Sequence, residues 1–247
     1  AFRERFVEDF AEVPPVDAAP RLCFITVCDL DAPSNDSLQA CADALRAQGD
    51  TAFDWVLAVP QTRLARQEAA LADLVTGLGR IVPFTGCPAD GLNAALDTLD
   101  DPDALVCVLD GTGRPTRDAV ALVRAAFAAY PDLMLLYTDE ERCDDDGRPL
   151  EPVFKPAFNR HLLEAWPYFG ALTVLRAGRA QATGLNATFG AAAFYDFLLR
   201  YLDGLPADGV RHLPRIAYAG PDAAPGFADP VTAERAATAL ATQLGLP

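Results

Sequence analysis

The segment LCFITVCDLDAPSNDSLQACADALRAQGDTAFDWVLAV, residues 22–59, contains two kinds of hydrophobic pattern. Its ends, Leu22–Val27 and residues 55–59, are short continuous apolar runs, which are typical of strands buried on both faces of a sheet. Between them, apolar residues recur at helical spacing after the capping candidates Ser34 and Asn35, namely at Leu38, Cys41, Ala42 and Leu45. This strand–helix–strand order predicts an α/β fold with a mainly parallel sheet flanked by helices.

The same alternation continues along the chain. Further strands are expected at 80–83, Leu105–Leu109 and 133–137. Helical stripes are expected around Leu71, Leu74, Val75 and Leu78; around Leu92, Ala95, Leu96 and Leu99; and around Val120, Val123 and Phe127, this last helix starting at Pro115 and Thr116. Two more helices are expected at 191–202 and 232–244, the second entered by Asp229 and Pro230.

The polar stretch at 139–160 holds three prolines and an Asp-Gly pair, so we expect a long loop there, at a strand end where α/β sheets place their sites. We expect residues 219–230, rich in Ala, Pro and Gly, to form a linker. The predicted organisation is an amphipathic helix or linker at 1–19, one domain at 20–220, and a tail with a helix at 221–247. We expect the chain to be a segment of a longer protein.

Composition excludes several classes of protein. The 247 residues are 51% hydrophobic and 22% charged, as in a folded globular protein. With 20 Lys and Arg against 35 Asp and Glu, the net charge of −15 argues against a nucleic-acid partner. The richest apolar run, at 119–137, is interrupted by Arg124, Pro131 and Asp132, so no membrane span is expected. The six cysteines are scattered and have no metal-ligand spacing, which predicts buried thiols in the reducing cytoplasm.

Short motifs for other chemistries are incomplete. The LDGTG sequence after the fourth expected strand resembles a phosphatase loop, but Val108 stands where that loop has its aspartate nucleophile. The acidic turn that ends at Gly147 lacks the oxygen ligands of a calcium loop. His161 and His212 accompany no recognisable serine or cysteine nucleophile, and we expect both to be capping or surface residues.

The block YTDEERCDDDGRPLEPVFKPAFNRHLLEAWPYFGALTVLR, residues 137–176, carries a resemblance. It is similar in length and in its central FKP to a segment of family 2 glycosyltransferases of bacterial polysaccharide synthesis. GLNAAL at 91–96, FYDFLLRYL at 194–202 and RHLPRIAY at 211–218 resemble further motifs of that family in the same order. The resemblance covers about residues 20–220 and implies the GT-A fold.

The resemblance also implies a site for a nucleotide-diphosphate sugar and a glycan acceptor, with Mg²⁺ or Mn²⁺ if the domain is active. Its donor side would involve Cys28 and Asp29 after the first strand, Asn93, and Asp110, Thr112 and Arg114 after the fourth. Asp110 would be the metal ligand. The acceptor side would involve Lys155 and Trp166.

This sequence departs from the family pattern at the reacting positions. Gln61 and Thr62 stand where the family has an acidic pair, and Thr112 stands at the second carboxylate of the metal motif. Phe194 stands at the catalytic base, and Ala219 and Gly220 replace an aromatic residue and a histidine. A phenyl ring accepts no proton, and losing a general base typically costs about 10²–10⁴ in rate.

We therefore expect a glycosyltransferase-like domain with weak or no activity, a pseudoenzyme that serves as a binding or structural module. One alternative is a metal-independent enzyme in which Arg114 or Arg117 neutralises the diphosphate. In that enzyme Asp139, Glu140 or Asp196 would be the substitute base, although Asp196 also has the spacing of a surface ion pair with Arg200. The other alternative is a protein-interaction module of a larger polysaccharide enzyme.

Overall fold

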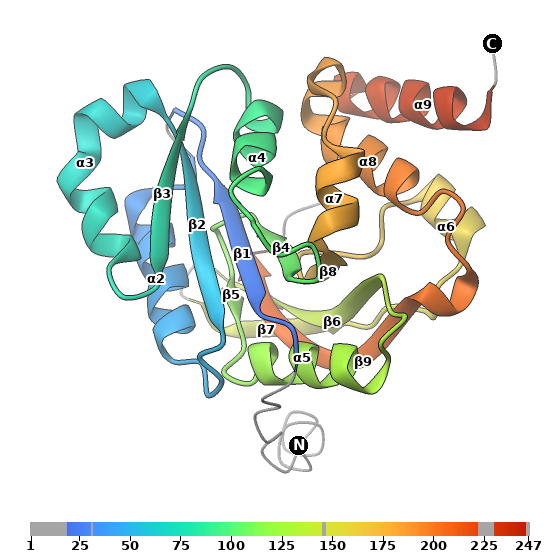
Figure 1. Cartoon of the computed structure of the whole chain (residues 1–247), viewed down its shortest axis with the longest axis horizontal. Helices are drawn as coiled ribbons and strands as arrows, with labels where there is room; N and C mark the ends of the chain where they lie inside the picture. The colour runs from blue at the N-terminus through green and yellow to red at the C-terminus, as the bar shows by residue number, and fades with distance from the viewer. Residues whose placement is uncertain (1–18, 31, 145–146, 222–229, 246–247) are drawn as a thin grey trace.

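The computed structural model describes residues 19–30, 32–144, 147–221 and 230–245. In this part of the chain, nine strands form a curled sheet in the order β3-β2-β1-β4-β8-β6-β9-β5, and β7 pairs with β6 (Figure 1). The strands are β1 (Leu22–Val27), β2 (Phe53–Pro60), β3 (Gly79–Phe84), β4 (Leu105–Leu109), β5 (Arg114–Pro115), β6 (Leu135–Cys143), β7 (Pro149–Val153), β8 (Thr173–Arg176) and β9 (Val210–Pro221).

The helices are α2 (Asn35–Arg46), α3 (Gln61–Val75), α4 (Pro88–Leu96), α5 (Ala119–Ala129), α6 (Arg160–Ala165), α7 (Ala177–Thr183), α8 (Ala193–Tyr201) and α9 (Pro230–Leu244). Two 3₁₀ segments, η1 (Ala187–Ala192) and η2 (Ala207–Gly209), precede α8 and β9. None of the helices in the described ranges is long and apolar enough to cross a bilayer.

The expected parallel sheet is found in the N-terminal half. There β1 lies between β2 and β4, parallel to both, and β2 is parallel to β3. Beyond β4 the sheet becomes mixed, because β8 runs antiparallel to both of its neighbours, β4 and β6, while β9 runs parallel to β6. The carboxyl ends of β1, β4, β6 and β9 therefore lie along one edge of the sheet, where open α/β sheets bind ligands.

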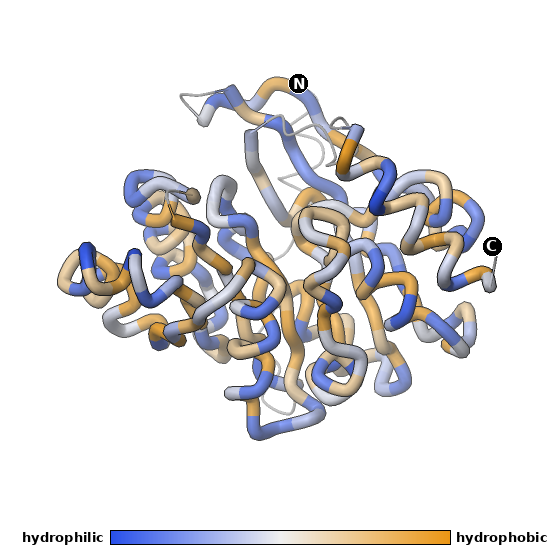
Figure 2. Tube along the Cα trace, turned by 90° about the horizontal axis from the view of Figure 1, so that it is seen from above, coloured by the Kyte–Doolittle hydropathy of each residue, from blue (hydrophilic) through white to orange (hydrophobic). Residues whose placement is uncertain are grey.

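Alternate residues of each central strand enter two cores. On β1, Leu22 and Phe24 face a core formed with α2, α3 and α5, whereas Cys23 and Ile25 face a core formed with α4, α7 and α8. Because helices cover both faces of the sheet, the central strands have continuous apolar sequences. In Figure 2 the hydrophobic colour follows the strands through the interior, and the hydrophilic colour is concentrated in the surrounding turns.

Several predicted elements are confirmed. The bounds of β1 and β4 match the expected ones, and Ser34 caps α2 by accepting a hydrogen bond from the backbone N–H of Ser37. The buried residues of α2 are the four of its predicted stripe. Five of the six cysteines are buried, Cys87 is half-buried, and none forms a disulfide.

Other predictions were wrong in type or extent. Of residues 139–160, all expected to be a loop, 139–143 belong to β6 and 149–153 form β7, because β6 continues past Tyr137 to pair with β7 on one side and β9 on the other. Pro115 belongs to β5 rather than to α5, which begins at Ala119. Residues 219–221 complete β9 instead of starting a linker. The expected N-terminal helix, residues 222–229 of the linker and the cap Asp229 lie outside the described residues.

Candidate functional site

A pocket of about 560 Å³ lies at the carboxyl ends of β4, β6 and β9. The segment between α6 and β8, with Trp166 and Tyr168, forms one part of its wall, and the start of α8 with Phe194 forms another. Thr232 of α9 also lines it. Its ionisable lining residues are Asp110, Glu140, Glu141, Arg142, Lys155, Tyr168, Tyr195 and Tyr218. The predicted residues Asp110, Glu140, Lys155, Trp166 and Phe194 thus lie around one cavity.

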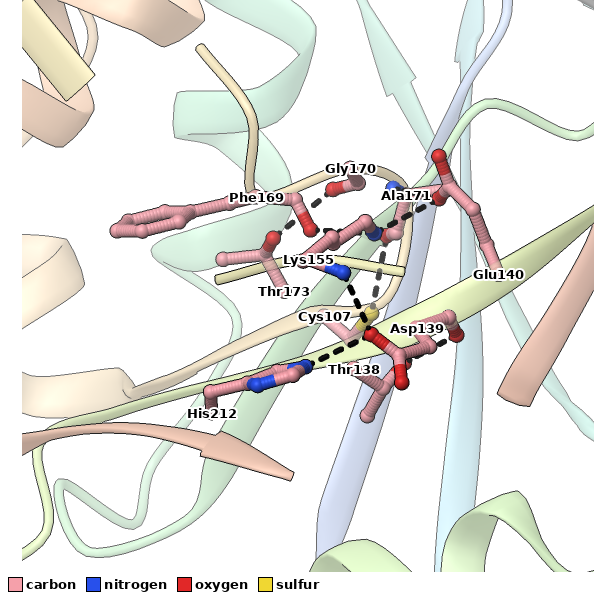
Figure 3. Close-up of polar contacts among 10 residues, drawn as sticks. All are labelled: Cys107, Thr138, Asp139, Glu140, Lys155, Phe169, Gly170, Ala171, Thr173 and His212. Carbon is pink, nitrogen blue, oxygen red and sulfur yellow. Dashed lines mark hydrogen bonds and ion pairs between the residues drawn. The ribbon is translucent and has the colours of Figure 1, made fainter. Parts of the chain in front are cut away.

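Lys155 links two segments that line this pocket (Figure 3). Its ammonium Nζ donates to Glu140 Oε2 at 3.0 Å and to the Phe169 carbonyl at 2.7 Å. Burial lowers the pKa of Lys155, while the Glu140 carboxylate acts in the opposite direction. Its side chain is only 3% exposed, so water does not replace either partner, and Lys155 therefore joins β6 to the segment before β8.

Gly170 makes this close approach possible. Its backbone φ is +77°, a value that residues other than glycine rarely adopt. A Cβ at this position would overlap Lys155 Nζ and Glu140 Oε2. Glu140 Oε2 also accepts from the backbone N–H of Ala171 at 3.2 Å. The carboxylate is therefore connected to the segment before β8 both directly and through Lys155.

Asp139 lies beneath Lys155 and is buried. Its Oδ1 accepts from the Lys155 backbone N–H at 2.9 Å and lies 2.8 Å from His212 Nε2 of β9. The His212 ring stacks on Tyr137, with ring centroids 5.0 Å apart. His212 is therefore an internal partner of Asp139, contrary to the expected capping or surface role, whereas His161 is exposed. Asp139 Oδ1 is therefore already in contact with two internal partners.

Asp110 lies at the pocket edge just after β4, and its Oδ1 accepts three hydrogen bonds. Two come from the backbone N–H groups of Thr112 and Gly113, at 2.8 and 3.3 Å. The third comes from the Tyr218 hydroxyl of β9 at 2.7 Å. Burial, and next the nearby Asp110 carboxylate, raise the pKa of Tyr218 far above its usual value, so the hydroxyl keeps the proton that it donates.

These residues do not fit a Mg²⁺ or Mn²⁺ ion. Such ions need several oxygen ligands, usually including one or two carboxylates. Thr112 provides a hydroxyl in place of the second carboxylate, and Glu140 is paired with Lys155. Over the described ranges, no three His, Cys, Asp or Glu side chains lie close enough together to hold a metal.

Phe194, at the position expected for the base, lines the pocket and stacks on Phe197 with centroids 5.6 Å apart. Two residues later, Asp196 points elsewhere, because its Oδ2 accepts from Arg200 Nη2 at 2.6 Å. Arg200 in turn donates to the carbonyls of Thr183 and Gly184, at the end of α7. The predicted pair of Asp196 and Arg200 is thus present, but Asp196 is buried rather than at the surface, and Arg200 caps the end of α7.

The remaining donor-side residues are not brought to the pocket. Cys28 is fully buried in the core, and burial raises the pKa of its thiol to about 11. Asp29 is exposed, and its Oδ1 accepts from the Leu30 backbone N–H. Asn93 exchanges two hydrogen bonds with the Leu185 backbone, at 3.0 and 2.8 Å, and so ties α4 to the segment before η1.

Arg114 and Arg117 are both exposed, and neither is among the residues that line the pocket. The Arg114 guanidinium lies against Gly147, in the turn between β6 and β7. The structure therefore does not bring either guanidinium together with Asp110 in the pocket.

Two aromatic side chains are exposed at the pocket. Trp166 is 45% exposed and Phe154 is 53% exposed. Tyr168, by contrast, is buried and accepts from the Asn159 backbone N–H at 2.9 Å. Exposed aromatic faces beside carboxylates can stack on a sugar ring while the carboxylates accept from its hydroxyl groups.

Sequence reasoning missed Tyr218, Gly170 and the role of His212. Tyr218 and His212 lie in RHLPRIAY, which was matched as a strand, but their partners Asp110 and Asp139 are distant in the chain. The positive φ of Gly170 has no signal in the neighbouring residues.

No family model matches the chain. It is 31% identical over 147 residues to the uncharacterized protein y4gI of Sinorhizobium fredii, covering 57% of this chain and 16% of that protein. It is 39% identical over 92 residues to the O-antigen biosynthesis protein RfbC of Myxococcus xanthus, covering 37% of this chain and 7% of that protein. The chain thus spans less than a fifth of the length of either curated relative.

Among solved structures, S. aureus TarS 1–349 in complex with UDP is similar with a TM-score of 0.65 and 14% identity, over 91% of this chain and 65% of that one. Glucosyl-3-phosphoglycerate synthase from Mycobacterium tuberculosis, in complex with Mn²⁺, UDP and glucosyl-3-phosphoglycerate, has a TM-score of 0.63 and 12% identity, over 93% and 82%. At these identities the likeness concerns the fold, and it confirms the architecture that the resemblance implied.

Proposed function

From the premise that the chain has the GT-A fold of glycosyltransferases, we propose that it is a family 2 glycosyltransferase-like domain that binds a saccharide and has little or no sugar-transfer activity of its own. The observation that carries this proposal is the composition of the pocket. Phe194, which the motif resemblance aligns with the catalytic base, lines it, and the Asp110 carboxylate accepts a hydrogen bond from Tyr218.

Transfer of a sugar from a nucleotide diphosphate requires two things of a site. A base must take the acceptor's proton, and positive charge must offset the charge that develops on the departing diphosphate. Asp139 is buried and accepts from the Lys155 backbone N–H, and Asp196 is paired with Arg200. Lys155 is paired with Glu140, and Arg114 lies at a turn outside the lining. The pocket has a volume of about 560 Å³ and two exposed aromatic side chains, which supports binding without transfer.

The alternative of a metal-independent enzyme is less well supported, because it needs Arg114 or Arg117 beside the pocket. The similarity to the O-antigen biosynthesis protein RfbC supports a role of this domain in surface-polysaccharide synthesis. Because the matched region is a small part of either relative, we propose that the domain acts within a longer chain, on the glycan that other domains make or extend.

Tryptophan fluorescence offers a direct test of binding. The chain has two tryptophans, and Trp55 is fully buried while Trp166 is exposed at the pocket. In a Trp55→Phe variant, methyl glycosides of glucose and N-acetylglucosamine, and their short oligomers, should change the emission of Trp166. The same titration of Trp166→Phe, which keeps only Trp55, is the control and should show no change. Absence of any response in Trp55→Phe would contradict the binding proposal.

Transfer is tested separately. The chain is incubated with UDP-glucose or UDP-N-acetylglucosamine, with and without Mn²⁺, and release of UDP is measured with and without the same oligosaccharides as acceptors. We expect release at the background rate. Turnover within the usual enzymatic range, about 1 s⁻¹ or faster, would show that the domain is an active transferase.

A further inference from the structure

Asp110 has one carboxylate oxygen that is fixed by the protein and one that is open. The three donors described above, the backbone N–H groups of Thr112 and Gly113 and the Tyr218 hydroxyl, all bond to Oδ1. Within the described ranges, Oδ2 has no hydrogen-bond partner. Asp110 is exposed and lines the pocket, so a ligand there can reach this oxygen. The carboxylate is therefore an oriented acceptor with free capacity.

Asp110 also lacks a cationic partner. Its three donors are neutral groups, and no ammonium or guanidinium of the described residues forms an ion pair with it. The two cations that line the pocket are already paired. Lys155 lies 3.0 Å from Glu140, and Arg142 lies 2.8 Å from Glu151. The lining holds three carboxylates against these two cations, which leaves a formal charge of −1. The net charge of −15 on the whole chain adds to this local charge.

The exposed aromatic faces of the pocket favour a ligand of the same sign. Trp166 and Phe154 both line it with about half of their surface exposed. The face of an aromatic ring carries negative potential and attracts a cation placed over it. A ligand that joins a sugar ring to a positive charge would use both the aromatic faces and Asp110. A neutral sugar can stack and donate from its hydroxyl groups but brings no charge, and Asp110 repels an acidic sugar.

We propose that the pocket is selective for a saccharide with an unacetylated amino group, whose ammonium pairs with Asp110 while its ring stacks on Trp166 or Phe154. The inference rests on the proposed function, because it names the class of saccharide that the same pocket binds. An amino group is the sugar substituent that supplies positive charge, whereas hydroxyl and acetamido groups are neutral and a carboxylate is negative. Asp110 thus recognises the ligand directly, in place of the metal-binding role that the resemblance implied.

Three methyl glycosides of different charge test the inference. At pH 6, methyl glucosaminide, methyl glucoside and methyl glucuronide carry charges of about +1, 0 and −1. The emission of Trp166 in the Trp55→Phe background gives the Kd of each. An exposed ion pair and a cation–π contact each change affinity by about two- to fivefold, so the glucosaminide should bind at least about fivefold more tightly than the glucoside. The glucuronide should bind more weakly than the glucoside. Ethylammonium, which has the charge without the ring, should bind at least about tenfold more weakly than the glucosaminide.

Asp110→Asn removes the charge and keeps Oδ1 as an acceptor for its three donors. In this variant the affinities for the glucosaminide and the glucoside should agree within about twofold. The matched control is Asp73→Asn, which removes the same charge from an exposed residue of α3 outside the lining and should keep the full preference. A salt titration tests the same point if Asp110→Asn does not fold. Raising NaCl from about 20 to 500 mM should reduce the preference to about twofold, because salt screens an exposed ion pair.

The outcomes separate this inference from the proposed function. Equal affinities for the glucosaminide and the glucoside with Asp110 present would overturn the inference and leave saccharide binding intact. A preference that persists in Asp110→Asn, or that ethylammonium matches, would overturn it as well. Failure of all three glycosides to bind would contradict the proposed function, and the inference with it.

Discussion

Replacing Gly170 by alanine tests whether the contact between Lys155 and Glu140 holds the pocket wall in place. The substitution adds one methyl group, and that group would overlap the two charged atoms of the pair. Both atoms are at the ends of flexible side chains and can move. Movement separates Nζ from Glu140 Oε2 and the Phe169 carbonyl, however, and Lys155 is too deeply buried for water to take their place.

The expected loss has two parts. Holding alanine at a φ of +77° costs about 1–2 kcal/mol. Weakening a hydrogen bond to a charged group costs about 1.5–3 kcal/mol more. We therefore expect the free energy of unfolding to fall by about 2.5–5 kcal/mol, which is large for a single methyl group.

Gly77→Ala separates these two parts. Gly77 has a φ of +75°, but nothing lies within 4 Å of the position that its Cβ would take. This variant should lose only the backbone part, about 1–2 kcal/mol. Urea unfolding of both variants at pH 7 measures the difference. Because Trp166 precedes Gly170 in the same segment, its emission maximum should also shift in Gly170→Ala and not in Gly77→Ala. Equal losses of stability, within about 0.5 kcal/mol, would refute the argument that Gly170 serves the ion pair.

The remaining predictions concern the alkaline limb of stability and two hydrogen-bonded side chains. Burial raises the pKa of four thiols and four phenols, so above pH 9 the folded protein keeps protons that the unfolded chain loses. The free energy of unfolding should therefore fall between pH 9 and pH 10.5, by up to about 1.4 kcal/mol per pH unit for each titrating group. Unfolding is measured under reducing conditions. Lys155 contributes in the opposite direction because its pKa is lowered, but it is one group against eight. A free energy of unfolding that stays constant or rises over this pH range would contradict the prediction. The groups are Cys23, Cys28, Cys41, Cys107, Tyr137, Tyr195, Tyr201 and Tyr218. Asn93→Ala removes both bonds to Leu185 and should cost about 1–3 kcal/mol in urea unfolding, whereas a loss below 0.5 kcal/mol would mean that the tie is unimportant. Asp196→Asn should lower stability by about 1–3 kcal/mol and leave the saccharide response of Trp166 unchanged; a lost response at unchanged stability would give Asp196 a direct role in the pocket.

The local hydrophobic pattern of the sequence was enough to predict the alternating strands and helices of this fold. The strand bounds of β1 and β4 and the buried stripe of α2 depend on spacing within a few residues, and periodicity reports such spacing directly. The β6–β7 hairpin is not predictable from local pattern, because Pro149, Pro152 and the Asp-Gly pair have the composition of a loop. Among the residues that the structure describes, β7 pairs only with β6, and such an edge strand tolerates prolines.

The site required the tertiary structure, because its contacts join residues far apart in the chain. The motif resemblance identified Asp110, Lys155, Trp166 and Phe194, and these do lie around one pocket. Only the folded chain brings Tyr218 to Asp110 and His212 to Asp139. Whether a carboxylate is open to a ligand or already hydrogen-bonded depends on partners from other strands. Sheet pairing decides which partners those are, and no spacing along the sequence encodes it.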